Sequence, residues 1–286
     1  MKKLIIIIIL ITAASSLHVM AQQNVHAFSI EGGGGLSTLV YQLSSGDRNV
    51  GLGGDFGLGY TFYRSNERVT ATGRIFRKNW GIYTGVGLGT YHAKSKLGQD
   101  MLITDYQTDI DVHQFEFHTS FPKYDETQSV LSVNIPVMAQ YQYGQYYFMG
   151  GFKYVIPINA KYGSKDVTLT NEAYYKEFKT KVDDLKFVGC GEFEHQDYKG
   201  KLDLGSSMLL ALEGGVRMRL SKQISLFTGV YFDYGLSNAY KGNPQWFIKY
   251  DDQNPADFST NSVLSLTADK VRLMAAGLKL RLTFER

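Results

Sequence analysis

The stretch Met208-Leu209-Leu210-Ala211-Leu212-Glu213-Gly214-Gly215-Val216-Arg217-Met218-Arg219-Leu220 decides the fold class. Its charged residues, Glu213, Arg217 and Arg219, all fall on odd-numbered positions, and the even-numbered positions are all apolar or glycine. Successive side chains of a β-strand point to opposite faces, whereas a helix would scatter these charges around its circumference. The pattern therefore predicts a strand with one apolar face and one charged face.

The same alternation recurs on both sides of this stretch. It is clear in residues 52–62, 131–143 and 278–284, and less regular in residues 26–43, 80–96, 146–163 and 223–240. With the first stretch these make eight segments, each long enough for the ~9–11 tilted residues that a barrel strand needs to cross a bilayer. Lipid offers no hydrogen bonds to a bare strand edge, so such a sheet must close on itself. We predict an all-β fold, an eight-stranded antiparallel up-and-down transmembrane β-barrel.

The lengths of the connections alternate along the chain. Those near residues 143–146 and 221–223 are tight, whereas those near residues 97–126, 164–202 and 241–262 are long. Short turns on the periplasmic side and long loops outside are the arrangement of outer-membrane barrels. Two connections depart from it: residues 44–49 are short for an outer loop, and residues 64–79 are long for a turn. We expect part of the latter, 69–76, to extend the flanking strands.

The N-terminal residues have the features of a secretory signal. Lys2-Lys3 precedes the apolar run 4–11, which is too short for a membrane anchor, and Val19-Met20-Ala21 suits cleavage. We predict a signal peptide over residues 1–21, an outer-membrane β-barrel over residues 22–286, and location in the cell outer membrane.

Charge and composition narrow the class of partner. Without Lys2-Lys3 the formal net charge falls from +3 to +1, and a near-neutral chain argues against nucleic acid. The single cysteine, Cys190, cannot form an internal disulfide, which excludes a small disulfide-stapled scaffold. High counts of Tyr (20), Phe (17) and Gly (30) suit a transmembrane barrel. We therefore expect outer-membrane lipid as the main partner.

The charged faces of the predicted strands point into the barrel and bring both signs together. A charge enclosed in a small lumen must be paired, since a lone buried charge costs several kcal/mol. Two interpretations remain open: a salt-bridged plug that stiffens the barrel, or an ion pathway. We favour the plug, because eight strands leave room for little besides side chains. The predicted inward charges are Glu31, Asp55, Lys153, Glu213, Arg217, Arg219, Asp233, Lys279 and Arg281.

Glycines also share an inward face in the segment 80–96. Gly81, Gly85, Gly87 and Gly89 alternate in phase with Tyr83 and Tyr91. A phosphate-binding loop would need a strand, a turn and a helix in succession, and no helical pattern follows. We expect these glycines to make room for bulky side chains inside a narrow barrel.

Candidates for catalysis are few. His118, Glu116 and Ser120 alternate onto one face in the second long loop, which could mimic a hydrolase cluster, but a solvated polar strand face explains them equally well. No pair of histidines has convincing metal-ligand spacing. We predict no catalytic residues, no metal site and no cofactor.

The long loops are rich in Tyr and Trp, and are either a recognition surface for an unidentified extracellular partner or packed over the barrel mouth.

Four segments together resemble the outer-membrane β-barrel family related to the N-terminal domain of OmpA-like proteins. The resemblance covers essentially the whole chain after the signal, and implies a polar, salt-bridged interior with roles in envelope integrity, adhesion or slow pore formation. OmpA-like proteins usually continue into a peptidoglycan-binding domain, and this sequence ends at Arg286, so wall anchoring is not expected. The segments are Gly54-Asp55-Phe56-Gly57-Leu58-Gly59-Tyr60-Thr61-Phe62, Val133-Asn134-Ile135-Pro136-Val137-Met138, Tyr231-Phe232-Asp233-Tyr234-Gly235-Leu236 and Gly277-Leu278-Lys279-Leu280-Arg281-Leu282-Thr283-Phe284.

We therefore predict a non-enzymatic barrel that stabilises the envelope and presents its loops outside. The alternatives are a porin for small solutes and, less favoured, an outer-membrane enzyme acting on lipid. A soluble exported barrel with an apolar ligand would need an apolar lumen, which the charged face argues against.

Overall fold

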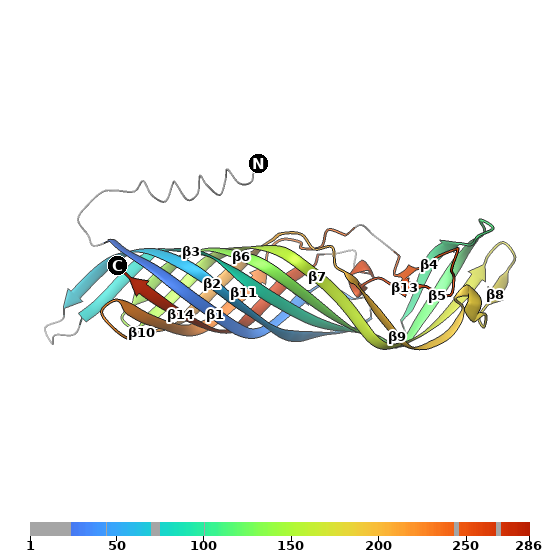
Figure 1. The fold of residues 1–286 in the computed structure, drawn as a ribbon, viewed down its shortest axis with the longest axis horizontal. Helices are drawn as coiled ribbons and strands as arrows, with labels where there is room; N and C mark the ends of the chain where they lie inside the picture. Colours follow the sequence, from blue (N-terminus) through green and yellow to red (C-terminus); the bar gives the residue numbers. More distant parts are fainter. Residues whose placement is uncertain (1–23, 44, 70–74, 100, 243–245, 267–269) are drawn as a thin grey trace.

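The computed structural model describes residues 24–43, 45–69, 75–99, 101–242, 246–266 and 270–286. Eight strands pair antiparallel in a closed ring, because β7 pairs with β10 and the last strand, β14, pairs with the first, β1 (Figure 1). This confirms the predicted eight-stranded up-and-down barrel. In ring order the strands are β1 (Asn24–Val40), β2 (Gly46–Val69), β3 (Ile75–Leu97), β6 (Asp125–Tyr143), β7 (Tyr146–Tyr175), β10 (Ser207–Arg219), β11 (Ile224–Gly235) and β14 (Arg272–Glu285).

Side chains alternate between the inside and the outside of the ring. In β6 every even-numbered residue from Glu126 to Gln142 is buried, and the residues between them face outward. The outward residues form a band around the barrel that we call the apolar belt. A soluble sheet would not leave so many large apolar side chains unpaired over a continuous surface. Belt residues include Phe28, Ile30, Leu52, Phe56, Leu58, Ile82, Val86, Leu88, Val137, Phe152, Ile156, Ile158, Val230, Leu278 and Leu280.

Aromatic side chains gather at the end of the barrel that carries the short turns. Trp80, Tyr141, Tyr143, Tyr146 and Phe148 are exposed there, next to the turn between β6 and β7. That turn has two residues, and the first, Gly144, has a φ of 61°, which a residue with a side chain seldom adopts. The hairpin of β2 and β3 continues past the same end to the pair Val69 and Ile75, as predicted for the flanks of this connection, and residues 70–74 lie outside the described residues.

The barrel wall continues at the opposite end into an open sheet that we call the extension. β7 is 30 residues long, and its second half pairs with β5 (Gln114–Lys123) on one side and with β9 (Gly191–Lys201) and β8 (Thr180–Val182) on the other. β4 (Leu102–Thr108) adds to the outer edge of β5. A short 3₁₀ helix, η1 (Lys186–Val188), precedes β9. Figure 1 shows the barrel and the extension along one long axis.

The connection between β11 and β14 crosses the inner face of the extension, and we call this segment, 236–271, the cap. It contains the small hairpin of β12 (Ile248–Lys249) and β13 (Ser259–Thr260), followed by η2 (Val263–Leu266). Phe247 packs edge-on against Phe121 and Tyr124 at ring-centroid distances of 5.3 and 5.6 Å. Phe247, Ile248, Val263 and Leu264 are buried in one apolar cluster with β5 and β7. This core holds the cap over the mouth of the barrel at the end away from the short turns.

The long connections near residues 97–126 and 164–202 were expected to be loops, and most of each is strand, because Phe115, Phe117 and Phe121 alternate with polar residues as regularly as the barrel strands do. The predicted signal peptide, residues 1–21, lies outside the described residues. Within the described part of the chain, no helix has the length and apolarity needed to span a membrane.

Candidate functional site: the barrel interior and its cap

Arg281 lies at the centre of the barrel interior. Its Nε donates to Glu31 Oε2 at 2.9 Å, and its Nη2 lies 2.6 Å from both carboxylate oxygens of Glu213. The guanidinium also stacks over the ring of Tyr83, 4.6 Å from its centroid. Since Glu31 is on β1, Glu213 on β10 and Arg281 on β14, one side chain that is only 2% exposed joins three strands.

The next pairs lie further along the interior. Lys279 Nζ is 2.9 Å from Glu31 Oε1 and 3.1 Å from Asp55 Oδ2, so Glu31 is shared between two cations. Lys153 Nζ is 2.5 Å from Asp233 Oδ2. The carboxylates of the barrel interior thus alternate with cations, which offsets the cost of removing each charge from water.

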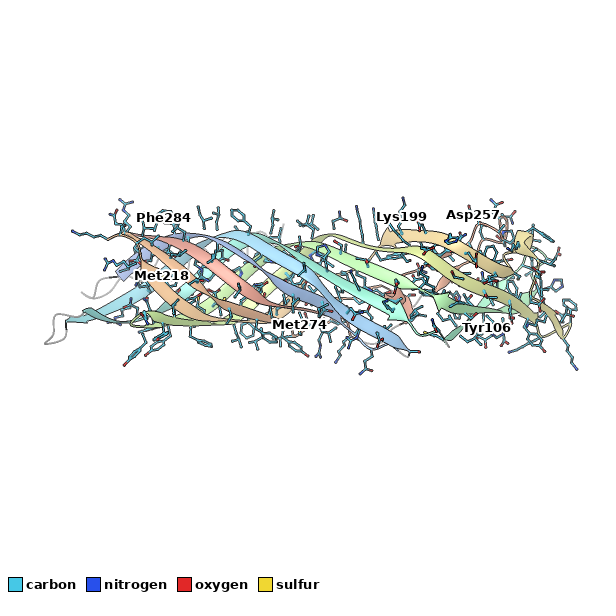
Figure 2. All side chains as sticks on the ribbon, turned by 90° about the horizontal axis from the view of Figure 1, so that it is seen from below. Tyr106, Lys199, Met218, Asp257, Met274 and Phe284 are labelled. Atoms are coloured by element: carbon cyan, nitrogen blue, oxygen red, sulfur yellow. The ribbon has the colours of Figure 1, made fainter. Side chains whose placement is uncertain are left out.

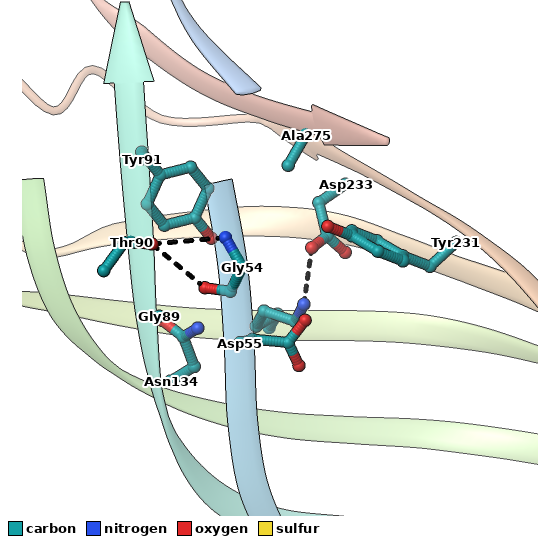
Figure 3. Close-up of a pocket in the computed structure, with 10 residues that line it drawn as sticks. Gly54, Asp55, Gly89, Thr90, Tyr91, Asn134, Tyr231, Asp233 and Ala275 are labelled. Atoms are coloured by element: carbon teal, nitrogen blue, oxygen red, sulfur yellow. Dashed lines mark hydrogen bonds and ion pairs between the residues drawn. The ribbon is translucent and has the colours of Figure 1, made fainter. Parts of the chain in front are cut away.

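A small cavity lies beside the pair of Lys153 and Asp233 (Figure 3). Its walls include Asp55, Tyr91 and Asn134. The space open to the centre of a water molecule is only about 10 Å³, which is room for about one water. Figure 3 shows the carboxylates of Asp55 and Asp233 reaching toward the centre of this region from different strands. The cavity is a gap in a packed interior and does not have the dimensions of a channel.

Arg217 belongs to a separate group near the short-turn end. Its Nη2 donates to Glu285 and to Ser225 Oγ, and its guanidinium lies 5.7 Å from the ring centroid of Phe227. Arg219, predicted to share the interior, differs: it is exposed, and its guanidinium donates to the backbone oxygens of Ser221 and Lys222. The alternation places Arg219 on the inward phase, but β10 ends there, so the side chain folds over the turn instead.

Several interior residues were not predicted. Glu285 continues the inward phase of Lys279 and Arg281, so extending the alternation by one step beyond Thr283 would have found it. Tyr147 donates to Glu213 Oε1 at 2.8 Å, and Met149 Sδ lies 2.9 Å from Arg281 Nη1. These two are uncharged, and nothing in a local pattern distinguishes them from other inward aromatic and apolar residues.

The cap is fastened to the barrel wall by Glu126, a carboxylate that the sequence analysis did not single out. The Ser262 hydroxyl donates to Oε1 at 2.5 Å and the Val263 N–H to Oε2 at 3.0 Å. Gln128 and Tyr124 donate the remaining hydrogen bonds, at 2.9 and 3.1 Å. Glu126 is 1% exposed, and no cation in the described part of the chain pairs with it. Burial raises the pKa of Glu126, although its four hydrogen-bond donors oppose that shift.

The predicted polar cluster of the second long loop lies on the outer face of the extension. Glu116 Oε2 lies 3.6 Å from His118 Nε2, and Thr104 Oγ1 lies 3.0 Å from His118 Nδ1. Nδ1 is therefore hydrogen-bonded and Nε2 lies beside a carboxylate, and Ser120 is on the same face but bonded to neither nitrogen. Among the described residues, no group of three or more His, Cys, Asp or Glu side chains is arranged to hold a metal ion.

Known proteins are similar to this chain in structure at low sequence identity. No family model and no curated protein match the chain. Among solved structures, Ail of Yersinia pestis, crystallised with the heparin analogue sucrose octasulfate, is 8% identical with a TM-score of 0.31, and the match covers 91% of this chain and 99% of Ail. The outer membrane protease OmpT of Escherichia coli is 9% identical with a TM-score of 0.27, covering 95% and 99%. The fold assignment rests on the strand pairing, and the resemblance to OmpA-like proteins stays a prediction.

Proposed function

We propose that this protein is a non-enzymatic outer-membrane β-barrel with a structural role. Ion pairs close its interior, and the extension with its cap, together called the head, lies outside the cell. The apolar belt supports membrane insertion, since an exposed apolar band around a closed sheet matches the lipid-facing surface of such barrels. Aromatic side chains at the short-turn end suit the membrane interface. Outer-membrane lipid is then the main partner, and the near-neutral charge gives no reason to expect nucleic acid.

One observation carries the non-conducting role: Arg281 joins Glu31 and Glu213 across the interior. A pore keeps its charged residues around a water-filled passage, where each is solvated. Here the central cation is fully enclosed, and its partners lie on either side of β14: Glu31 on the neighbouring strand β1, and Glu213 two strands away on β10. The exposed head, rich in tyrosine, supports a surface-interaction role as the second part of the proposal.

Arg281→Leu tests the plug. The substitution leaves Glu213 without its cation, and breaking a buried pair typically costs about 3–5 kcal/mol, so the urea midpoint of the refolded protein should fall. Arg219→Leu is the matched control, because Arg219 is an exposed arginine at the end of a barrel strand and its loss should change stability by about 0.5 kcal/mol or less.

Planar-bilayer conductance on the same samples separates the plug from a porin. The wild-type protein should show no steady open channel. If the wild type conducts, and Arg281→Leu alters ion selectivity while the urea midpoint stays fixed, the charges line water and the protein is better described as a small-solute porin.

A further inference from the structure

Four exposed lysines form a patch on the outer surface where the barrel passes into the extension. This lysine patch consists of Lys94 on β3, Lys161 on β7, and Lys199 and Lys201 on β9. Figure 2 shows Lys199 projecting from the surface at this height, well away from Phe284 at the short-turn end.

Strand register brings the patch together. Lys161 stands directly opposite Lys201, and Lys199 stands opposite Gly163, which in turn is opposite Thr127. Side chains directly opposite each other on one face have Cβ atoms about 4.5–5.5 Å apart. Because Gly163 has no side chain, there is a gap in the layer of side chains between Thr127 and Lys199. The ammonium groups of the patch lysines lie around this gap.

The arrangement is unfavourable for the protein alone. Like charges directly opposite each other destabilise a sheet. Within the described chain no carboxylate forms an ion pair with these four lysines: Asp125 pairs with Lys96 at 3.5 Å, and Asp197 accepts the N–H of Asp166. Asp47, opposite Lys96 on β2, and Asp203, two residues beyond Lys201, are further exposed acids at this height, and neither forms an ion pair with the four lysines. An anionic ligand would supply the missing counter-charge.

The height of the patch identifies the source of that anion. Ile158, 58% exposed, belongs to the apolar belt and lies only three residues before Lys161 on β7. With a rise of about 3.3 Å per residue, the lysines stand roughly 10 Å further along a tilted strand, at the depth of lipid head groups beyond the hydrocarbon core. Basic residues at that depth attract anionic lipid.

We propose that the lysine patch binds the phosphate groups of an outer-leaflet glycolipid, with Lys161, Lys199 and Lys201 around Gly163 as the principal contacts. This rests on the proposed membrane insertion of the barrel. It adds a specific lipid site on one side of the barrel, on the faces of β3, β6, β7 and β9. The apolar belt alone would not distinguish one lipid head group from another.

The test compares two triple variants in phosphatidylcholine nanodiscs supplemented with lipid A, a diphosphorylated glucosamine lipid. Lipid A retention is measured by native mass spectrometry after release into detergent. Lys161→Ser/Lys199→Ser/Lys201→Ser should weaken retention by about tenfold or more. Lys179→Ser/Lys222→Ser/Lys249→Ser removes the same charge from exposed lysines elsewhere and should retain lipid A as the wild type does.

Each other outcome has a distinct meaning. Equal losses in both triple variants would show a general effect of net charge and overturn the site. Inorganic pyrophosphate at millimolar concentration is the competitor for the wild-type site. If it releases lipid A and binds the protein as tightly as lipid A does, the site recognises a free phosphate and not a lipid. If the barrel inserts, judged by dichroism and by faster migration of the unheated protein in SDS gels, but shows no preference for lipid A, only this inference fails. If it does not insert, the proposed function fails with it.

Discussion

The carboxylate of Glu126 accepts four hydrogen bonds and donates none. The donors belong to Ser262, Val263, Gln128 and Tyr124. The Val263 N–H can only donate, whereas the Ser262 and Tyr124 hydroxyls can donate or accept, so the carboxyl group can take up a proton and still hold the cap. The residue therefore fixes where the cap meets β6. Its charge is the unfavourable part of the arrangement, because burial disfavours the ionised form.

We expect the cap to be more firmly closed at pH 5 than at pH 7.5. Because the pKa of Glu126 is raised in the folded protein, its contribution to stability is fully present below the unfolded value of 4.5 and is lost as the pH rises through the folded value. Hydrogen exchange of the Val263 amide, corrected for the intrinsic rate, should show greater protection at pH 5. In Glu126→Gln this pH response should disappear.

Asp125→Asn provides the control for that measurement. Asp125 is the neighbouring carboxylate, but it is half-exposed and paired with Lys96, so its loss should leave the pH response intact. Lower protection of Val263 at pH 5 than at pH 7.5 in the wild type would contradict the assigned role of Glu126.

Among the elements, β7 and the β5–β6 run opposite it connect the barrel to the extension. The apolar face of their upper part, with Phe117, Phe121, Val167 and Leu169, is buried in one cluster with Phe247, Ile248, Val263 and Leu264 of the cap. The extension therefore depends on the cap to bury that face, much as the barrel depends on its own closure.

Phe247→Ala should release the cap without opening the barrel. Truncating a fully buried phenylalanine typically costs about 3–5 kcal/mol, and this one contacts both Phe121 and Tyr124. Limited proteolysis should then cut within residues 246–266, while the unheated protein keeps its fast mobility in SDS gels. Trp246→Ala, at a half-exposed neighbour, should leave the cut rate close to wild type. Equal cleavage of both variants would mean that Phe247 does not hold the cap.

The barrel elements were predictable from sequence and the extension was not, for a physical reason. Strands 131–143 and 208–220 each have one face made only of apolar residues and glycine, which forms the belt, and carry all their charged residues on the other face, which lines the interior. β5 alternates as well, with His118 and Glu116 outward, but its outward face is polar, so it looks like a solvated loop. Arg281 and Glu31 are 250 residues apart in sequence. Their pairing depends on the register between the first and last barrel strands, β1 and β14, and a local sequence pattern does not contain that register.

For the whole molecule, the uneven ends predict its orientation in the membrane. An epitope tag inserted at Lys179, in the turn between β7 and β8, should be reached by antibodies on intact cells. Tags at Gln145 or Lys222, in the two short turns, should be reached only after the outer membrane is permeabilised. Labelling of the Gln145 tag on intact cells would reverse the orientation.

The 30-residue length of β7 also sets how the molecule responds to force. A pull on the tip of the extension is directed along β7, which continues from the extension into the barrel as one strand, so it acts on the lateral hydrogen bonds of β7 with β6 and β10 in shear. Bonds loaded in shear resist together, whereas bonds peeled from one end break in succession. The extension is thus joined to the barrel by a continuous strand and not by a flexible tether, so tension on its tip reaches the barrel wall through hydrogen bonds that are loaded together.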